Sequence, residues 1–164
     1  MRSRIFAILL ALPISAVAGQ PTMTIEHAWS RAAIAGREGV IYMTITNSGV
    51  PDSMIGVSTP VAATAQLHQT INDNGVMKMR AVPSLAIGHD QSVTLAPSGY
   101  HIMLMSLKQT LKQGDSFPVT VTFQKTGTLT ATVTVEKAGA TGMAPADTSQ
   151  HMGMPVQHED KQRP

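Results

Sequence analysis

Apolar and polar residues alternate over short stretches along most of the chain, and this pattern predicts β-strands. Residues two apart in an extended chain share a face, so an alternating run turns one face inward and the other outward. Helical periodicity is weak after residue 18. We expect nine strands, over Thr22–Trp29, Val40–Thr46, Met54–Thr59, Ala65–Thr70, Val76–Arg80, Gln91–Leu95, His101–Leu107, Phe117–Phe123 and Leu129–Glu136.

Turn-forming residues separate these strands. Asn74-Gly75 is a pair that tolerates positive φ, so the strands on either side of it are expected to form a hairpin. Short strands with such turns favour an all-β sandwich or barrel. The 119 residues from Gly19 to Lys137 are enough for one domain with its own core and too few for two.

The first 18 residues are expected to be a signal peptide rather than part of the fold. Arg2 and Arg4 precede an apolar run, Ile5–Leu12, that is too short to span a bilayer. Ala16-Val17-Ala18 then fits a cleavage site of small residues. We therefore expect an exported protein that does not span the membrane.

Charge and composition exclude several functions. The whole chain has 12 basic and 10 acidic residues, and removing Arg2 and Arg4 leaves ten of each. A neutral domain with no basic run gives no reason to expect nucleic-acid binding. The sequence shows no nucleophile–base pair, no paired carboxylates and no phosphate-binding glycine loop, so we do not expect an enzyme. A monomer is expected.

One predicted strand carries unusual chemistry. If residues 101–107 are extended, His101, Met103 and Met105 share one face, while Ile102 and Leu104 share the other. Ile102 and Leu104 are ordinary core residues. A face that only needed to pack would favour β-branched or aromatic side chains over histidine and methionine.

A second stretch supplies partners of the same kind. His68 lies in one predicted strand, and Met77 and Met79 lie in the next, on a common face, so alternation alone cannot choose between these two methionines. Imidazoles and thioethers, in a chain without cysteine, suit copper(I). The competing interpretation is that the methionines fill gaps in the core and the histidines are structural.

The spacing of four of these residues resembles a known signature. Ten residues separate His68 from Met79, twenty-one separate Met79 from His101, and one separates His101 from Met103. This His-x10-Met-x21-His-x-Met pattern resembles that of the periplasmic copper chaperones called PCu(A)C. The resemblance covers roughly residues 22–137 and includes Ala28-Trp29-Ser30-Arg31, Ile41–Asn47, Ser106-Leu107-Lys108, Gly114-Asp115 and Val119–Phe123. Ser106 is a departure, because many relatives have glycine there.

The resemblance implies more than the residues alone. It selects Met79 over Met77, and so a copper(I) site of His68, Met79, His101 and Met103. It implies a cupredoxin-like Greek-key β-sandwich. It also implies delivery of copper to the assembly of cytochrome c oxidase copper centres, with a thioredoxin-like assembly factor or the oxidase subunit itself as acceptor.

The chain after Lys137 differs from the rest. Residues 138–146 have the composition of a flexible linker, and the remainder has too few apolar groups to fold alone, so we expect a disordered tail over 138–164. His-rich tracts are typical of metal binding. Candidate tail ligands, with copper(II) favoured by the imidazoles, are His151, Met152, Met154 and His158. Longer members of the resembled family carry such an extension.

Of the other functions, an electron-transfer cupredoxin of the blue-copper type is disfavoured, because it needs a cysteine thiolate, which this chain lacks. Two others stay open at this point. Copper resistance or storage would use the same ligands as delivery. An exported interaction module would bind no metal at all. Trp29 is expected to pack, and His27 and His89 are expected to be solvated. Arg31 is expected either to pin a loop or to pair with an acidic residue.

Overall fold

The computed structural model describes residues 23–143 and shows ten strands with no helix in that range. The strands are β1 (Met23–Arg31), β2 (Gly39–Asn47), β3 (Asp52–Ser58), β4 (Ala62–Asp73), β5 (Val76–Ala81), β6 (Leu85–Ile87), β7 (Gln91–Leu95), β8 (Tyr100–Leu107), β9 (Ser116–Phe123) and β10 (Gly127–Glu136). Among residues 23–143 there is no helix that is long and apolar enough to cross a bilayer.

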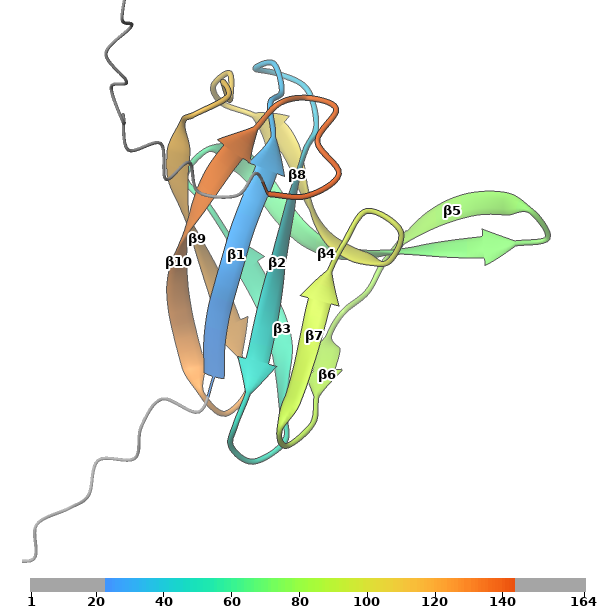
Figure 1. Ribbon diagram of the computed structural model, residues 1–164, viewed down its shortest axis with the longest axis vertical. Helices are drawn as coiled ribbons and strands as arrows, with labels where there is room; N and C mark the ends of the chain where they lie inside the picture. The colour runs from blue at the N-terminus through green and yellow to red at the C-terminus, as the bar shows by residue number, and fades with distance from the viewer. Residues whose placement is uncertain (1–22, 144–164) are drawn as a thin grey trace, which may run out of the picture.

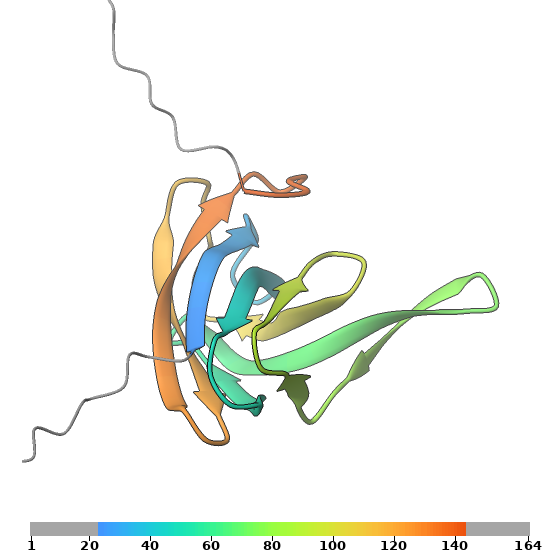
Figure 2. The same cartoon turned by 60° about the horizontal axis from the view of Figure 1, so that its bottom comes forward.

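The strands form one curled sheet whose two ends approach each other (Figures 1 and 2). The order is β5-β4-β8-β2-β1-β10-β9-β3-β6, with β7 also paired to β2. β1 pairs with β10 in parallel, and the remaining ladders are antiparallel. Because β3 also contacts β4, the sheet wraps around a single interior as a sandwich.

The inward-facing side chains of the alternating strands fill that interior. Ile41 and Ile45 of β2, Ile102 and Leu104 of β8 and Val119 of β9 are completely buried in one cluster. The inward face of β8 is therefore committed to packing, and its other residues are free to serve a different purpose.

The nine strands expected from the sequence are all present, and β6 is an additional one. Its three residues follow Pro83 and are too few to show alternation. β4 is longer than expected, because it continues past Thr70 to Asp73 as one arm of a hairpin. The pattern of apolar and polar residues did not predict that this part of β4 would extend beyond the sandwich.

The β4–β5 hairpin projects from the body of the molecule (Figures 1 and 2). Asn74 (φ 53°) and Gly75 (φ 85°) both adopt left-handed conformations, as a two-residue hairpin turn requires. All six residues of β5 are exposed. We call the part of this hairpin from Thr70 to Met79 the arm.

Two further sequence features have a clear structural place. Ser106, which departs from the resembled pattern, has φ 53°, a conformation that glycine adopts with least strain. Asp52 is buried at the start of β3 and accepts hydrogen bonds from the amides of Ser53, Lys125 and Thr126 and from the Thr126 hydroxyl, at 2.7–2.9 Å. Asp52 thereby ties the β9–β10 turn to β3.

Asp52 makes acid stability testable. Burial alone would raise the pKa of Asp52, but the hydrogen bonds from Thr126, Ser53 and Lys125 outweigh it and lower the pKa to about 2. The folded-state pKa lies below the unfolded value of about 3.9, so the stabilisation is complete above pH 4 and is lost as the pH falls towards 2. We expect Asp52→Asn to lower the free energy of unfolding at pH 7 by about 1.5–3 kcal/mol.

Urea denaturation at pH 7, 4 and 2 measures this effect. The difference between wild type and Asp52→Asn should shrink at pH 2, where Asp52 loses its charge. Asp73→Asn is the matched control, since Asp73 makes an exposed ion pair with Lys78 that contributes little. An equal difference at all three pH values would contradict the assignment.

Candidate metal centre

Two histidines face each other across neighbouring strands. In the antiparallel β4–β8 ladder His68 is directly opposite His101, and their ring centroids are 6.0 Å apart with the planes inclined at 51°. Ile102 and Leu104 occupy the inward face of β8, so alternation turns His101 and Met103 to the other face. Since directly paired residues share a face, His68 lies on that same outer face.

Each histidine has a nitrogen without a protein partner. His68 Nδ1 and His101 Nε2 are buried and make no hydrogen bond to any residue between 23 and 143. The other ring nitrogens do have neighbours, since His101 Nδ1 is 3.3 Å from the Gly99 carbonyl oxygen and His68 Nε2 is 3.5 Å from Gln66 Oε1. Donation to these oxygens places the proton there, so His68 Nδ1 and His101 Nε2 carry lone pairs that can bind a metal.

The environment of His101 favours the neutral ring. Burial lowers the pKa of His101, the Gly99 carbonyl partly opposes this, and the neighbouring His68 lowers it further. A neutral imidazole is the form that binds metal. His101 is thus held ready as a ligand at neutral pH.

Methionines flank the histidine pair on the same face. Met103 is opposite Gln66 and Met79 is opposite Thr70, so each lies one step along β4 from His68. Residues in such diagonal positions are about 7–8 Å apart, with their Cβ atoms somewhat closer, so long side chains can reach a common ion. Met77 is opposite Asn72, one step farther from His68.

The pairing register therefore collects His68, Met79, His101 and Met103 into one patch, from strands that are separate in sequence. It also distinguishes the two methionines of β5, which alternation alone could not do. Two imidazole nitrogens and two thioethers are a soft donor set that suits copper(I). Among residues 23–143, no group of three or more His, Cys, Asp or Glu side chains forms an alternative metal site.

Met103 lines a groove together with residues that the sequence did not connect with the site. This groove of about 280 Å³ is lined by Met103, Val40, Arg31 and Ala138, among others. Arg31 Nε donates a hydrogen bond of 2.8 Å to the Ala140 carbonyl, which confirms that Arg31 pins a loop. Ala140 is buried against Trp29 and Tyr42, whose ring centroids are 4.5 Å apart.

That cluster confirms that Trp29 packs, although outside the main interior. Ala140 packs against the domain, while residues 138, 139 and 141–143 are exposed. The hydrogen bond from Arg31 to Ala140 joins residues 109 positions apart, so no local sequence signal indicated it. Gln66 and Gly99 were also missed as neighbours of the histidines. The position of Gln66 two residues before His68, on the same face, was the available signal.

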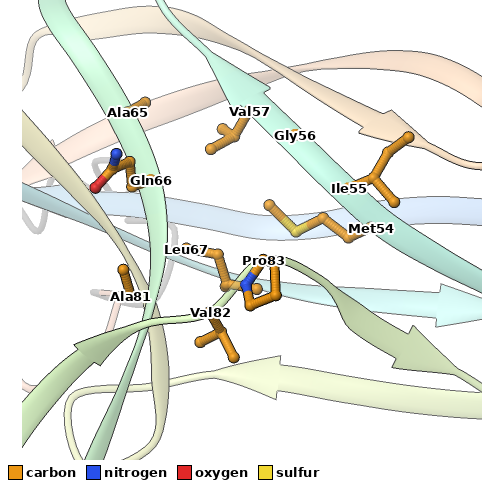
Figure 3. A pocket seen from close by; sticks show the side chains of 10 residues that line it. All are labelled: Met54, Ile55, Gly56, Val57, Ala65, Gln66, Leu67, Ala81, Val82 and Pro83. Carbon is orange, nitrogen blue, oxygen red and sulfur yellow. The ribbon is translucent and has the colours of Figure 1, made fainter.

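A second groove, of about 410 Å³, is lined by neither histidine, although it includes Gln66 (Figure 3). It opens between β3 and β4 and its side chains are mainly aliphatic, including Met54, Val57, Leu67 and Val82. None of the four candidate ligands lines it. Its chemistry gives no reason to place a metal there.

The remaining sequence predictions can be placed simply. His27 and His89 are exposed, as expected, and His89 Nδ1 is 2.7 Å from the Gly49 carbonyl oxygen. The predicted tail ligands His151, Met152, Met154 and His158 lie outside the described residues. They stay a prediction.

Comparison with known proteins identifies similar sequences. The family model described as "Putative lipoprotein LpqE-like" matches residues 23–135. A curated relative from Leifsonia xyli subsp. xyli, named "Putative lipoprotein Lxx21020", is 32% identical over 114 residues. That match covers 68% of this chain and 68% of the relative.

Solved structures with the same fold include metal-bound proteins. The copper-bound PCuAC domain from PmoF2 has a TM-score of 0.60 and 28% identity, over 71% of this chain and 93% of that domain. The solution structure of CuI-DR1885 from Deinococcus radiodurans has a TM-score of 0.59 and 31% identity, over 74% of this chain and 83% of that one. These matches confirm the all-β, cupredoxin-like fold and the resemblance to PCu(A)C proteins.

The unpaired nitrogen of His101 predicts a stability effect. A buried polar atom without a partner costs about 1–3 kcal/mol, so His101→Phe should raise the free energy of unfolding of the metal-free protein by about 1 kcal/mol. The Gly99 carbonyl keeps a donor in the variant, because it also accepts a 3.0 Å hydrogen bond from the Thr70 amide.

Urea denaturation of the metal-free protein provides the measurement. His89→Phe is the control, since His89 is exposed and hydrogen-bonded, and it should show no such gain. Destabilisation by His101→Phe of more than about 1 kcal/mol would contradict the view that His101 is retained at a cost to stability.

Proposed function

This chain belongs to the LpqE-like family, and on that premise we propose that it is a copper carrier that holds copper(I) on His68, Met79, His101 and Met103. The observation that carries the proposal is the pair of directly opposed histidines, each with a buried nitrogen that has no partner among residues 23–143. The copper-bound PCuAC domain and CuI-DR1885 support it, because both share the fold at 28–31% identity.

The chemistry of the four residues suits carriage rather than catalysis. Thioethers and neutral imidazoles stabilise copper(I) and bind it less tightly than thiolates do, so the cargo can be released. They also form no disulfides, which matters for a protein exported to an oxidising compartment. Oxidation of methionine to its sulfoxide is the corresponding weakness of such a site.

Exposure differs across the proposed site in a way that suits transfer. His101 is 3% exposed and held within the wall of the sandwich, whereas Met79 is 60% exposed on the arm. An acceptor protein can therefore approach from the side of Met79 while the histidines keep their positions. The metal moves between ligand sets without leaving contact with one of them.

The proposed role is delivery in the periplasm after removal of the signal peptide over residues 1–18. The acceptor is a copper protein, with a thioredoxin-like assembly factor of cytochrome c oxidase or the oxidase subunit itself as the candidates. Storage or resistance would use the same four ligands, and it differs in needing no acceptor. Residues 144–164, with His151 and His158, are proposed as an accessory copper(II) segment.

Substitution of the two β5 methionines tests the ligand assignment. Met79→Leu should weaken copper(I) binding at least tenfold, about 1.4 kcal/mol, because it removes one of the four donors. Met77→Leu, one step farther from His68, should change the affinity less than twofold. Competition with a chromophoric copper(I) chelator at pH 7 measures both values.

The two variants are matched controls for each other, since both make the same change on one face of one exposed strand. A larger loss for Met77→Leu than for Met79→Leu would show that the ligand was assigned to the wrong residue. Failure of the wild-type protein to compete for copper(I) at all would contradict the proposed function.

A further inference from the structure

The methionines of the described domain differ in burial, and Met103 and Met105 are partly buried, between the two extremes. Met23, Met43 and Met54 are each 1% exposed and fill the interior, as methionine commonly does. Met77 and Met79 are 58% and 60% exposed, so packing does not account for them. Exposed apolar residues on an edge strand are a liability for aggregation, which makes their presence on β5 informative.

The exposed methionines belong to a row that follows β4. Met77 is opposite Asn72, Met79 is opposite Thr70, and His68 comes next, paired with His101. Beyond His68, Met103 is opposite Gln66 and Met105 is opposite Thr64. We call Met77, Met79, Met103 and Met105 the methionine row. Neighbours on one strand, such as Met77 and Met79, are two residues or about 7 Å apart. The steps from Met79 to His68 and from His68 to Met103 run diagonally to the adjacent strand.

The row begins near the tip of the arm. Met77 is two residues from Gly75 of the turn, and the arm extends away from the sandwich (Figures 1 and 2). Met77 is therefore the first thioether of the row that an ion or a partner meets when approaching from the tip. The distance from Met77 to Met79 is one step, so their flexible side chains can contact the same ion in turn.

We propose that Met77 is a capture ligand, which binds copper(I) briefly together with Met79 and passes it along the row to His68 and His101. This inference rests on the proposed function, since it needs the four-residue site as the destination. Only copper–sulfur and copper–nitrogen bonds are exchanged. The ion stays copper(I), and no proton moves, because the accepting nitrogens already carry lone pairs.

Such a role separates rate from affinity. Met77 does not belong to the final site, so its removal leaves the bound state unchanged and slows both entry and departure. A residue that merely stabilised the arm would instead change the equilibrium. The two cases are distinguished by measuring both quantities on the same variants.

Stopped-flow transfer of copper(I) from bicinchoninate to the full-length mature protein, at pH 7, provides the test. Met77→Leu should slow transfer at least fivefold, with an equilibrium affinity within twofold of the wild type. Met143→Leu is the first control, because Met143 is also exposed but lies outside the row. It should leave the rate unchanged.

A second control tests the face of the strand. Lys78 is opposite Ile71 and so projects from the other face of β5. Met77→Leu combined with Lys78→Met restores a thioether to the arm, but on the wrong side, and should leave transfer slow. Loss of the exposed Lys78–Asp73 ion pair is a small effect.

The outcomes separate the two claims. If the wild type takes up no copper(I), the proposed function fails and the capture role fails with it. Equal rates for wild type and Met77→Leu, with copper still bound, overturn the capture role alone. So does recovery by methionine at position 78, or an affinity loss of tenfold or more in Met77→Leu.

Discussion

The site depends on one constraint, which is that two imidazoles lie opposite each other on adjacent strands, each with one nitrogen that no residue between 23 and 143 pairs with. Folding normally satisfies buried polar groups, and an unpaired one is costly. His68 and His101 are held in place by the β4–β8 ladder. The inward-facing residues of that ladder, Leu67, Ile102 and Leu104, are buried in the interior. The packing of the sandwich thus holds a donor pair in place before any metal arrives.

Around this pair the fold provides two different surroundings. On one side Met103 lies near a wall that Arg31 secures by binding the Ala140 carbonyl. On the other side Met79 stands on an arm whose strand, β5, is exposed throughout. Rigid support for the histidines and open access through the methionines are both properties that a carrier needs, and the strand register supplies them together.

Much of this arrangement could be predicted from the sequence, for an identifiable reason. Because successive side chains of a strand point to opposite faces, the sequence of residues 101–105 predicts which of them share a face. Asn74-Gly75 likewise predicts a hairpin turn. The two-residue turn at Asn74-Gly75 also fixes the β4–β5 register, and that register places Met79 nearer than Met77 to His68. The limits are equally specific. Which residue of β4 meets His101 depends on the β4–β8 register, which is set by contacts distant in sequence. The same applies to the contact of Ala140 with Trp29 and to β6, whose three residues are too few for a pattern.

The most direct test of the account is to add one equivalent of copper(I) to the mature protein and observe histidine ring nitrogens and methionine methyl groups by NMR. We expect shifts at His68 Nδ1 and His101 Nε2, the two ring nitrogens without a partner in the described part of the chain, and at the methyl groups of Met79 and Met103. The buried core methyls of Met23 and Met43 should not move. Shifts confined to His151, Met152, Met154 and His158, with the histidines of the sandwich unchanged, would contradict it.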